Sequence, residues 1–355
     1  MPRPSTSRSL LAAIAVSALV LAGCGSDPGG STNRDGDRSV AVQLNWVPEP
    51  EFGGFWQAQL DGDFADAKLK VELISGGPSV PAAQLVASGK VPFGVVSGGE
   101  LLSLNEQGGN LVAIFTVFQG DPTAIMVHAQ SPWQTLEQLW RSDATIACES
   151  YLPYVTYLNR MYGGQNLKMV PHTTSLANFV NDSSLAQQCF VFAEPVTLEL
   201  EGIETRVFPV LESGFNPYTG VVVTNRAYLD ANPAICRDMV EALRRGWAGY
   251  LEDPTRANEA MTKLNPAMSL KAMNLAAKKQ RFLVEDEVTR ANAIGWMTAE
   301  RWKTLAEQMT ELGKLKSVPT AIEGGVFWQP PVSAGPITPN EPTAPPGAAA
   351  NESSG

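Results

Sequence analysis

The sequence predicts an α/β protein of two lobes, each a mostly parallel sheet flanked by helices. Short apolar runs alternate with helical segments, and this alternation occurs twice along a body that spans residues 39–329. The chain has 355 residues, of which 44% are hydrophobic and 17% are charged. This composition is globular, and the chain is long enough to build two cores.

The first set of elements is expected between residues 40 and 118. Residues 40–46 alternate as a strand does, and a turn over 47–52 leads into a helix that opens at Gly53 and Gly54. Further strands are expected at 69–74, 92–96 and 111–118, with helices near 82–88 and 100–105.

The second set follows, with strands expected at 145–148, 167–170 and 189–192 and helices near 155–162, 176–180 and 195–201. We expect the extended stretches 123–128 and 219–224 to connect the two lobes and to act as a hinge. Lobe 1 would then comprise residues 39–128 and 219–329, and lobe 2 residues 129–218.

The chain after Thr224 turns helical. Asn232 and Pro233 form a cap-and-proline signal for a long helix whose apolar residues recur every four positions. Asp253 and Pro254 repeat that signal for the next helix, and Thr298 precedes the last one. Trp247, Trp296 and Trp302 are expected to pack in the core.

The amino terminus has the pattern of an export signal. Arg3 and Arg8 precede an apolar run over residues 10–22, about 20 Å of helix and shorter than the ~30 Å core of a bilayer. The run ends in Leu21, Ala22, Gly23 and Cys24, which resembles the bacterial lipobox. We expect a signal peptide over 1–23 and lipidation at Cys24; an ordinary hydrophobic start with an incidental cysteine is the alternative.

The segments that flank the body are poor in apolar residues. Residues 24–38 are expected to form a flexible tether and 330–355 a disordered tail. The body is therefore expected to lie outside the cell membrane, anchored by lipid.

Several functions lack support in the sequence. The net charge of −10, without a basic cluster, disfavours nucleic-acid binding. The chain has only two histidines, His128 and His172, and no paired-histidine spacing, so no metal site is expected. There is no phosphate-binding Gly-Lys loop and no G-x-S-x-G elbow, and no cofactor is expected.

Three cysteines remain once Cys24 is assigned to lipid. In an oxidising compartment at most one disulfide can form among Cys148, Cys189 and Cys236. We expect the pair Cys148–Cys189, because both lie near the ends of second-lobe strands.

Four stretches carry a resemblance to a known family. They are Leu44-Asn-Trp-Val-Pro-Glu-Pro-Glu-Phe-Gly-Gly-Phe55, Ala87-Ser-Gly-Lys-Val-Pro-Phe-Gly-Val95, Phe192-Ala-Glu-Pro195, and Asp253-Pro-Thr-Arg-Ala257 with Ile294-Gly-Trp-Met, Trp302 and Leu312-Gly. Their order resembles the solute-binding proteins of bacterial ABC importers, in the branch that binds thiamine-pyrimidine precursors, alkanesulfonates and nitrate. The body is most similar to the pyrimidine-precursor side of that branch.

The resemblance implies a type II periplasmic-binding-protein fold that closes on a small molecule, a permease as partner, and a monomer. One departure concerns the first loop, where Glu49 and Glu51 stand in place of the Asn or Asp and frequent His of the precursor binders. A binder of sulfonate, nitrate or another organic solute stays open as an alternative. So do a pyrimidine-synthase-like enzyme and a structural or signalling module.

Candidate ligand-binding residues lie where strands end, because ligands of open α/β sheets bind outside the carboxyl ends of strands. Aromatic rings in these loops offer flat surfaces for stacking, and carboxylates offer acceptors for an amine, amidine or protonated heterocycle. Solvated surface acids and core aromatics are the plainer interpretation. The full set is Trp46, Glu49, Glu51, Phe52, Gly53, Ser97, Gly98, Gln119, Tyr151, Tyr154 and Glu194. It predicts an amine-bearing heteroaromatic ligand.

Overall fold

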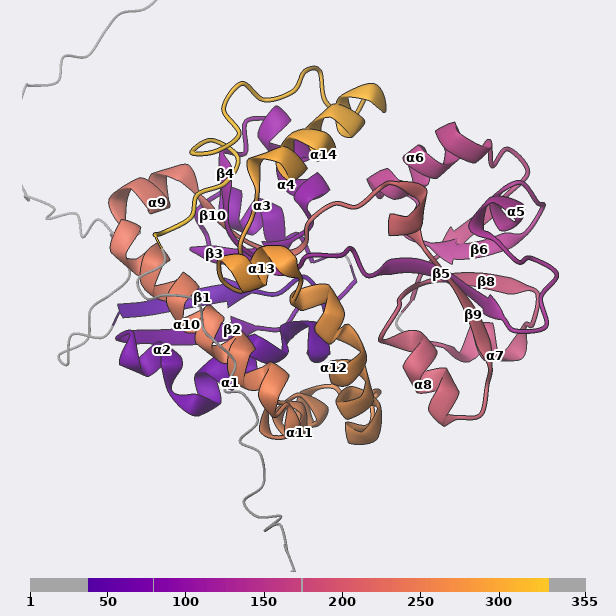
Figure 1. Ribbon diagram of the computed structural model, residues 1–355, viewed down its shortest axis with the longest axis horizontal. Coiled ribbons are helices and arrows are strands. Elements are labelled where there is room, and N and C mark those ends of the chain that lie inside the picture. Colours follow the sequence, from indigo (N-terminus) through magenta and orange to yellow (C-terminus); the bar gives the residue numbers. More distant parts are fainter. Residues whose placement is uncertain (1–37, 79, 174, 332–355) are drawn as a thin grey trace, which may run out of the picture.

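The computed structural model describes residues 38–78, 80–173 and 175–331. Figure 1 shows two lobes side by side. The expected signal peptide, the lipidation site Cys24, nearly all of the tether and nearly all of the tail lie outside the described residues.

Lobe 1 is built on a five-stranded sheet in the order β2-β1-β3-β10-β4. Its strands are β1 (Arg38–Gln43), β2 (Leu69–Ile74), β3 (Phe93–Val96), β4 (Leu111–Phe118) and β10 (Thr219–Asn225). β1 pairs in parallel with β2 and β3, whereas β10 runs antiparallel to both β3 and β4. The sheet is therefore mostly parallel, as predicted.

Lobe 2 repeats the same arrangement in the order β7-β6-β8-β5-β9. Its strands are β5 (Thr123–His128), β6 (Thr145–Cys148), β7 (Lys168–Pro171), β8 (Leu185–Phe190) and β9 (Thr205–Pro209). β5 is the antiparallel strand here. In each sheet, the antiparallel strand is the one that enters from the other lobe, so the chain crosses twice.

The segments in which the chain passes from one lobe to the other differ from the expected ones. Residues 123–128 form β5 inside the second sheet and 219–224 lie in β10 inside the first, so the expected lobe boundary at 128 is wrong. All six residues of β5 are buried, which suits a central strand and not an exposed connection. The chain passes between the lobes at 119–122 and 214–218.

Helices cover both faces of each sheet. Lobe 1 carries η1 (Pro50–Phe52), α1 (Gly53–Asp61), α2 (Asp63–Asp66), α3 (Ala82–Ala87), α4 (Gly98–Glu106) and α9 (Arg226–Ala231), followed by α10 (Pro233–Glu252), α11 (Thr255–Leu264), α12 (Leu270–Val284), α13 (Glu287–Ala291) and α14 (Ala299–Glu311). Lobe 2 carries α5 (Leu136–Trp140), α6 (Pro153–Tyr162), α7 (Ala177–Asn181), α8 (Glu194–Leu200) and η2 (Val210–Ser213).

Two glycines bring α1 and α10 into close contact. A Cβ at Gly53 would lie 2.0 Å from the Tyr250 ring, and one at Gly54 would lie 2.3 Å from the Trp247 ring. Trp247 is fully buried, as is Trp302 on α14, so both pack in the core as predicted; Trp296 is half-buried. The tight packing of α10 fixes the position at which α1 begins, and thus the loop before it.

One strand of lobe 2 lies earlier than expected. β8 covers Leu185–Phe190 and not 189–192, because Gln187 and Gln188 continue the strand although they interrupt its apolar run. Both glutamines are buried, and Gln188 is hydrogen-bonded. A polar pair inside a strand conceals it from a search for apolar runs.

The expected disulfide is absent, since Cys148, Cys189 and Cys236 are all free and buried. β6 and β8 are parallel neighbours, and their register sets Ala147 opposite Gln187. Cys189 is therefore one residue out of step with Cys148, and the two side chains point to opposite faces of the sheet. They belong to different hydrophobic clusters.

Among the described helices, none has the length and apolar character needed to cross a membrane.

Candidate functional site

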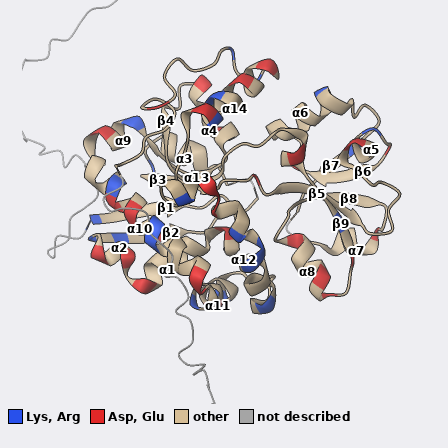
Figure 2. Ribbon diagram, viewed as in Figure 1, with Lys and Arg blue, Asp and Glu red and all other residues tan. Residues whose placement is uncertain are grey.

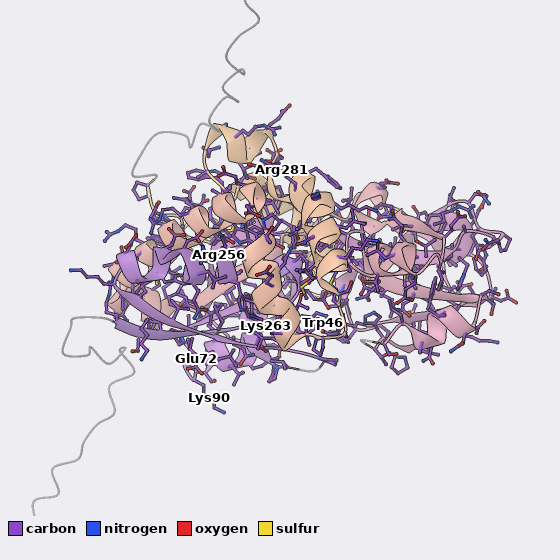
Figure 3. All side chains as sticks on the ribbon, turned by 90° about the horizontal axis from the view of Figure 1, so that it is seen from below. Trp46, Glu72, Lys90, Arg256, Lys263 and Arg281 are labelled. Atoms are coloured by element: carbon purple, nitrogen blue, oxygen red, sulfur yellow. The ribbon has the colours of Figure 1, made fainter. Side chains whose placement is uncertain are left out.

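A cavity of about 180 Å³ lies between the lobes and takes its walls from both. It is found where β1, β3, β6 and β8 end, as expected for an α/β protein. Figure 3 shows Trp46 at the junction of the two lobes. Lobe 1 also contributes the residues after β3, and lobe 2 contributes the starts of α6 and α8.

Seven of the eleven candidate residues line this cavity: Trp46, Glu49, Glu51, Ser97, Tyr151, Tyr154 and Glu194. The other four do not. Phe52 packs in the core against Phe55, and Gly53 lies beneath Tyr250. Gly98 donates its N–H to the Tyr218 carbonyl, and Gln119 donates its side-chain amide to the Trp296 carbonyl. Gly99, beside Gly98, reaches the cavity instead.

Three carboxyl groups meet on one side of the cavity. Glu49 and Glu51 come from the loop and η1 after β1, while Glu194 begins α8 in the other lobe. Burial raises the pKa of Glu49 to about 8 and that of Glu194 to about 7, and Glu194 also raises the pKa of Glu49 through charge repulsion. The pKa of Glu51 lies well above its ordinary value, by burial and then by repulsion from Glu49 and Glu194.

The loop that holds Glu49 and Glu51 is fixed by amide side chains from the C-terminal helices. Asn265 Nδ2 donates to the Pro48 carbonyl at 3.2 Å and to Glu49 Oε1 at 3.3 Å. Gln280 Nε2 donates to the Pro50 carbonyl at 2.8 Å. Gln280 lies on α12 and Asn265 directly follows α11, far along the chain from the loop, so no local sequence pattern indicates these contacts.

A second group of polar residues forms the lobe 2 wall. The Tyr154 hydroxyl donates to Gln188 Oε1 at 2.7 Å, and Gln188 Nε2 donates to Glu149 Oε2 at 3.0 Å. The exposed Tyr151 donates its hydroxyl to the other Glu149 oxygen at 2.9 Å. Glu149 is therefore fully engaged within the protein, in contrast to the carboxyl group of Glu51.

His172 lines the cavity, although no motif in the sequence marks it as a candidate. It follows β7 in lobe 2, and its ring lies 6.2 Å from the Trp46 ring of lobe 1, centroid to centroid, with a tilt of 31°. Both of its ring nitrogens are buried, and within the described residues neither has a hydrogen-bond partner. Trp46 and His172 therefore form an aromatic contact from one lobe to the other.

The floor of the cavity belongs to the crossing segments. Asp121 is buried and accepts hydrogen bonds from the hydroxyls of Thr123, at 3.0 Å, and Thr219, at 2.7 Å. Arg301 of α14 donates to the carbonyl groups of Gln119, Asn216 and Pro217, so one side chain holds both crossings. Its guanidinium carbon also lies 4.1 Å from the centroid of the Tyr218 ring.

The cavity lining contains no Lys or Arg among the described residues, although it contains several acids. Figure 2 shows basic residues on the outer helices of lobe 1, α10 and α12 among them. Within the same described ranges, no three His, Cys, Asp or Glu residues are arranged to hold a metal ion. The described lining thus offers hydrogen-bond acceptors and flat rings, with no Lys or Arg to attract an anionic ligand.

Comparison with known proteins places the chain in a family. A family model described as "NMT1/THI5 like" matches residues 49–257, more than half of the chain. The chain belongs to the NMT1/THI5-like family. The matched segment of this family member begins at Glu49 and includes Glu51 and Glu194.

A curated relative of this NMT1/THI5-like protein is the riboflavin-binding protein RibY of Chloroflexus aurantiacus. The two are 22% identical over 298 residues, which cover 81% of this chain and 84% of RibY.

The solved structures that resemble it include the aliphatic sulphonate binding protein SsuA of Escherichia coli, at 15% identity and a TM-score of 0.58, covering 89% of this chain and 98% of that one. The alkanesulfonate-binding protein SsuA of Xanthomonas axonopodis pv. citri, bound to MOPS, matches at 13% identity and a TM-score of 0.58, covering 82% and 98%. This family member therefore has the periplasmic-binding-protein fold that the sequence predicts.

Proposed function

We propose that the protein is the extracytoplasmic solute-binding component of an ABC importer, which captures a small amine-bearing heterocycle between its lobes and delivers it to a permease. The observation that carries this proposal is the cavity itself, which is shared by two lobes and lined by buried carboxyl groups and aromatic rings. The named relatives are binding proteins, which favours capture over catalysis.

The cavity chemistry favours a ligand rich in hydrogen-bond donors. Glu49, Glu51 and Glu194 are acceptors when ionised, and an amine or amidine edge satisfies them. A sulfonate or nitrate would face these carboxyl groups without any Lys or Arg from the described lining. A thiamine-pyrimidine-precursor-like solute combines the required amine with a ring that stacks on Trp46.

A flavin is a second candidate. The relative RibY is named for riboflavin binding, and a flavin carries both a flat ring system and hydroxyl donors. The cavity of about 180 Å³ favours a single ring in the present arrangement of the lobes. A flavin would therefore require a wider separation of Trp46 and His172.

The ligand class is tested by a thermal-shift screen of the purified protein with aminopyrimidines, riboflavin, taurine, an aliphatic sulfonate and nitrate. We expect aminopyrimidines to raise the melting temperature, because a ligand that binds only the folded state stabilises it. A rise with riboflavin alone would select the second candidate. A rise with the anions alone would contradict the amine-bearing ligand.

Attachment to the outer side of the cell membrane through Cys24 belongs to the same proposal, and we expect the protein to be a monomer. Cys24→Ser should abolish lipid labelling and leave an unprocessed or soluble form. Continued incorporation of radiolabelled fatty acid by that variant would contradict the anchor.

A further inference from the structure

The carboxyl group of Glu51 differs from the other acids of the cavity in having no hydrogen-bond partner among the described residues. The residue is 7% exposed and lines the cavity. Glu194 Oε2 accepts from the Phe190 N–H at 2.9 Å, and Glu49 accepts from Asn265. No hydrogen bond between described residues reaches the Glu51 side chain, which lines the cavity. A carboxyl group that lines a cavity and is not bonded within the protein is free to bond a ligand there.

The other acids of the cavity lining already accept hydrogen bonds from groups within the protein. Glu100 accepts from the Ser97 N–H and hydroxyl in a capping box at the start of α4. Glu149 and Asp121 are hydrogen-bonded as described above. The other titratable groups of the lining are Tyr151, Tyr154, His172 and Cys189, from the wall of lobe 2.

The nearest helices do not supply a counter-charge. On α12, which contacts both η1 and α8, Lys279 pairs with Glu199 at 2.6 Å and Arg281 with Glu285 at 2.9 Å. Neither cation lines the cavity. Arg301 donates its hydrogen bonds to carbonyl groups of the segments that join the lobes. Glu49, Glu51 and Glu194 therefore share a desolvated site with no basic side chain from the described residues beside them.

Glu51 is buried while Glu49 and Glu194 are half-buried, and no Lys or Arg of the described lining accompanies them. Burial and mutual repulsion both penalise ionisation of all three carboxyl groups. The free-energy cost is lowest when one of the three carboxyl groups keeps its proton. The raised pKa of each of the three groups, all shifted first by burial, agrees with this conclusion. These costs favour a site in which one of the three carboxyl groups keeps its proton.

We propose that Glu51 transfers a proton to a ring nitrogen of the captured solute, so that the ligand is bound as a cation beside a carboxylate. This inference rests on the proposed function and specifies how the site recognises its ligand. The O–H bond of the Glu51 carboxyl breaks and an N–H bond forms on the ring, with no other reactant. The amino group next to that nitrogen donates to the second carboxylate oxygen, which gives two parallel charge-assisted hydrogen bonds.

The proposal also explains why the loop sequence has two glutamates and an aromatic residue close together. A protonated ring is attracted to the face of Trp46 as well as to the carboxylates. A solute without a basic ring nitrogen beside an amino group can stack on Trp46 but cannot form the paired hydrogen bonds to the Glu51 carboxylate. Recognition would then discriminate aminopyrimidine-type edges from neutral aromatic rings of the same size.

The test is a nitrogen NMR measurement on the purified protein with ¹⁵N-labelled 4-aminopyrimidine, at a pH at which the free probe is neutral. The ring-nitrogen chemical shift reports protonation directly. We expect the bound probe to show the shift of the protonated ring. In Glu51→Gln, which cannot supply the proton, the probe should bind about tenfold or more weakly and show the neutral shift.

Glu199→Gln is the matched control, because Glu199 is an exposed acid of α8 that pairs with Lys279 outside the cavity. It should leave both affinity and chemical shift unchanged. Tight binding with the neutral shift in the wild-type protein would overturn the proton transfer and leave the proposed function intact. A protonated probe in Glu51→Gln would overturn the role of Glu51. Failure of every aminopyrimidine to bind would contradict the proposed function itself.

Discussion

The two histidines of the chain have opposite environments. His128 is stacked on Phe179 at 4.3 Å between ring centroids and bonds to the Phe179 carbonyl at 2.8 Å, inside lobe 2. His172 lies at the cavity against Trp46, with both ring nitrogens lacking a partner among the described residues. One histidine is therefore part of a core, whereas the other is available to a ligand.

Replacement of these histidines should separate binding from stability. His172→Ala should weaken binding of 4-aminopyrimidine by up to about tenfold, because an aromatic contact contributes ~0.5–1.5 kcal/mol, while the melting temperature of the empty protein stays nearly unchanged. His128→Ala should lower the melting temperature and leave the affinity unaffected. Calorimetry and thermal melting measure both quantities. An unchanged affinity in His172→Ala would remove that residue from the site.

The raised pKa of Glu49 predicts how the stability of the protein depends on pH. Its pKa rises from 4.5 to about 8 on folding, so between these values the folded protein binds more protons than the unfolded chain. The free energy of unfolding should therefore fall as the pH rises from about 4.5 to about 8. Melting temperatures across this range should decline in the wild type and decline less in Glu49→Gln. A wild-type melting temperature that rises steadily over the range would contradict the burial of these acids without a counter-charge.

Among the structural elements, the two crossing segments depend on a single helix. Arg301, in the first turn of α14, binds the carbonyl groups of both crossings and the Asn216 side chain, the latter at 2.9 Å. It also lowers the pKa of Asp121, although burial outweighs this effect and the pKa is raised overall. Removing Arg301 would leave several buried carbonyl groups without donors.

Arg301→Met should lower the free energy of unfolding by about 2 kcal/mol or more, because each buried acceptor left unpaired costs ~1–3 kcal/mol. Hydrogen exchange at 119–122 and 214–218 should become faster than in the wild type. Lys303→Met, on the same helix, is the control, because Lys303 is exposed and its 3.6 Å pair with Glu307 adds little. Equal exchange protection in wild type and Arg301→Met would show that α14 does not hold the crossings.

An element can be predicted from the sequence when the residues that determine it are neighbours in the chain. β2, β4 and β6 have the predicted bounds, because their apolar runs are bounded by turn residues. The sequence of β5 predicts a connection between lobes, because its place inside a sheet depends on pairing with β8 and β9, which lie far along the chain. The acid cluster was predicted from motif positions, whereas His172, Asn265 and Arg301 reach the site through tertiary contacts that no local pattern encodes.

At the scale of the whole molecule, the lobes approach each other closely at two helix starts. Gly99, at the start of α4 in lobe 1, faces Pro153, at the start of α6 in lobe 2; a Cβ at Gly99 would lie 3.1 Å from Pro153 Cγ. Together with the contact between Trp46 and His172, this approach brings residues of both lobes into contact beside the cavity. Two lobes joined by two crossing segments are suited to hinge closure around a ligand.

Gly99→Ala should hold the lobes further apart, because the added methyl group falls within the contact distance to Pro153. The affinity for 4-aminopyrimidine, measured by calorimetry, should fall because the lobes pack less closely around the probe. Ser103→Ala, one turn further along α4, is the control for the change of side chain within that helix. An affinity in Gly99→Ala equal to that of the wild type would contradict closure at this contact.

Capture of an amine-bearing heterocycle by an acid-lined cavity is tested most directly by calorimetric titration of the purified protein with 4-aminopyrimidine and, in parallel, with an aliphatic sulfonate. We expect saturable binding of the aminopyrimidine and no measurable heat from the sulfonate, because the described cavity lining presents Glu49, Glu51 and Glu194 without a basic side chain. Saturable binding of the sulfonate with no response to the aminopyrimidine would contradict this assignment of the ligand.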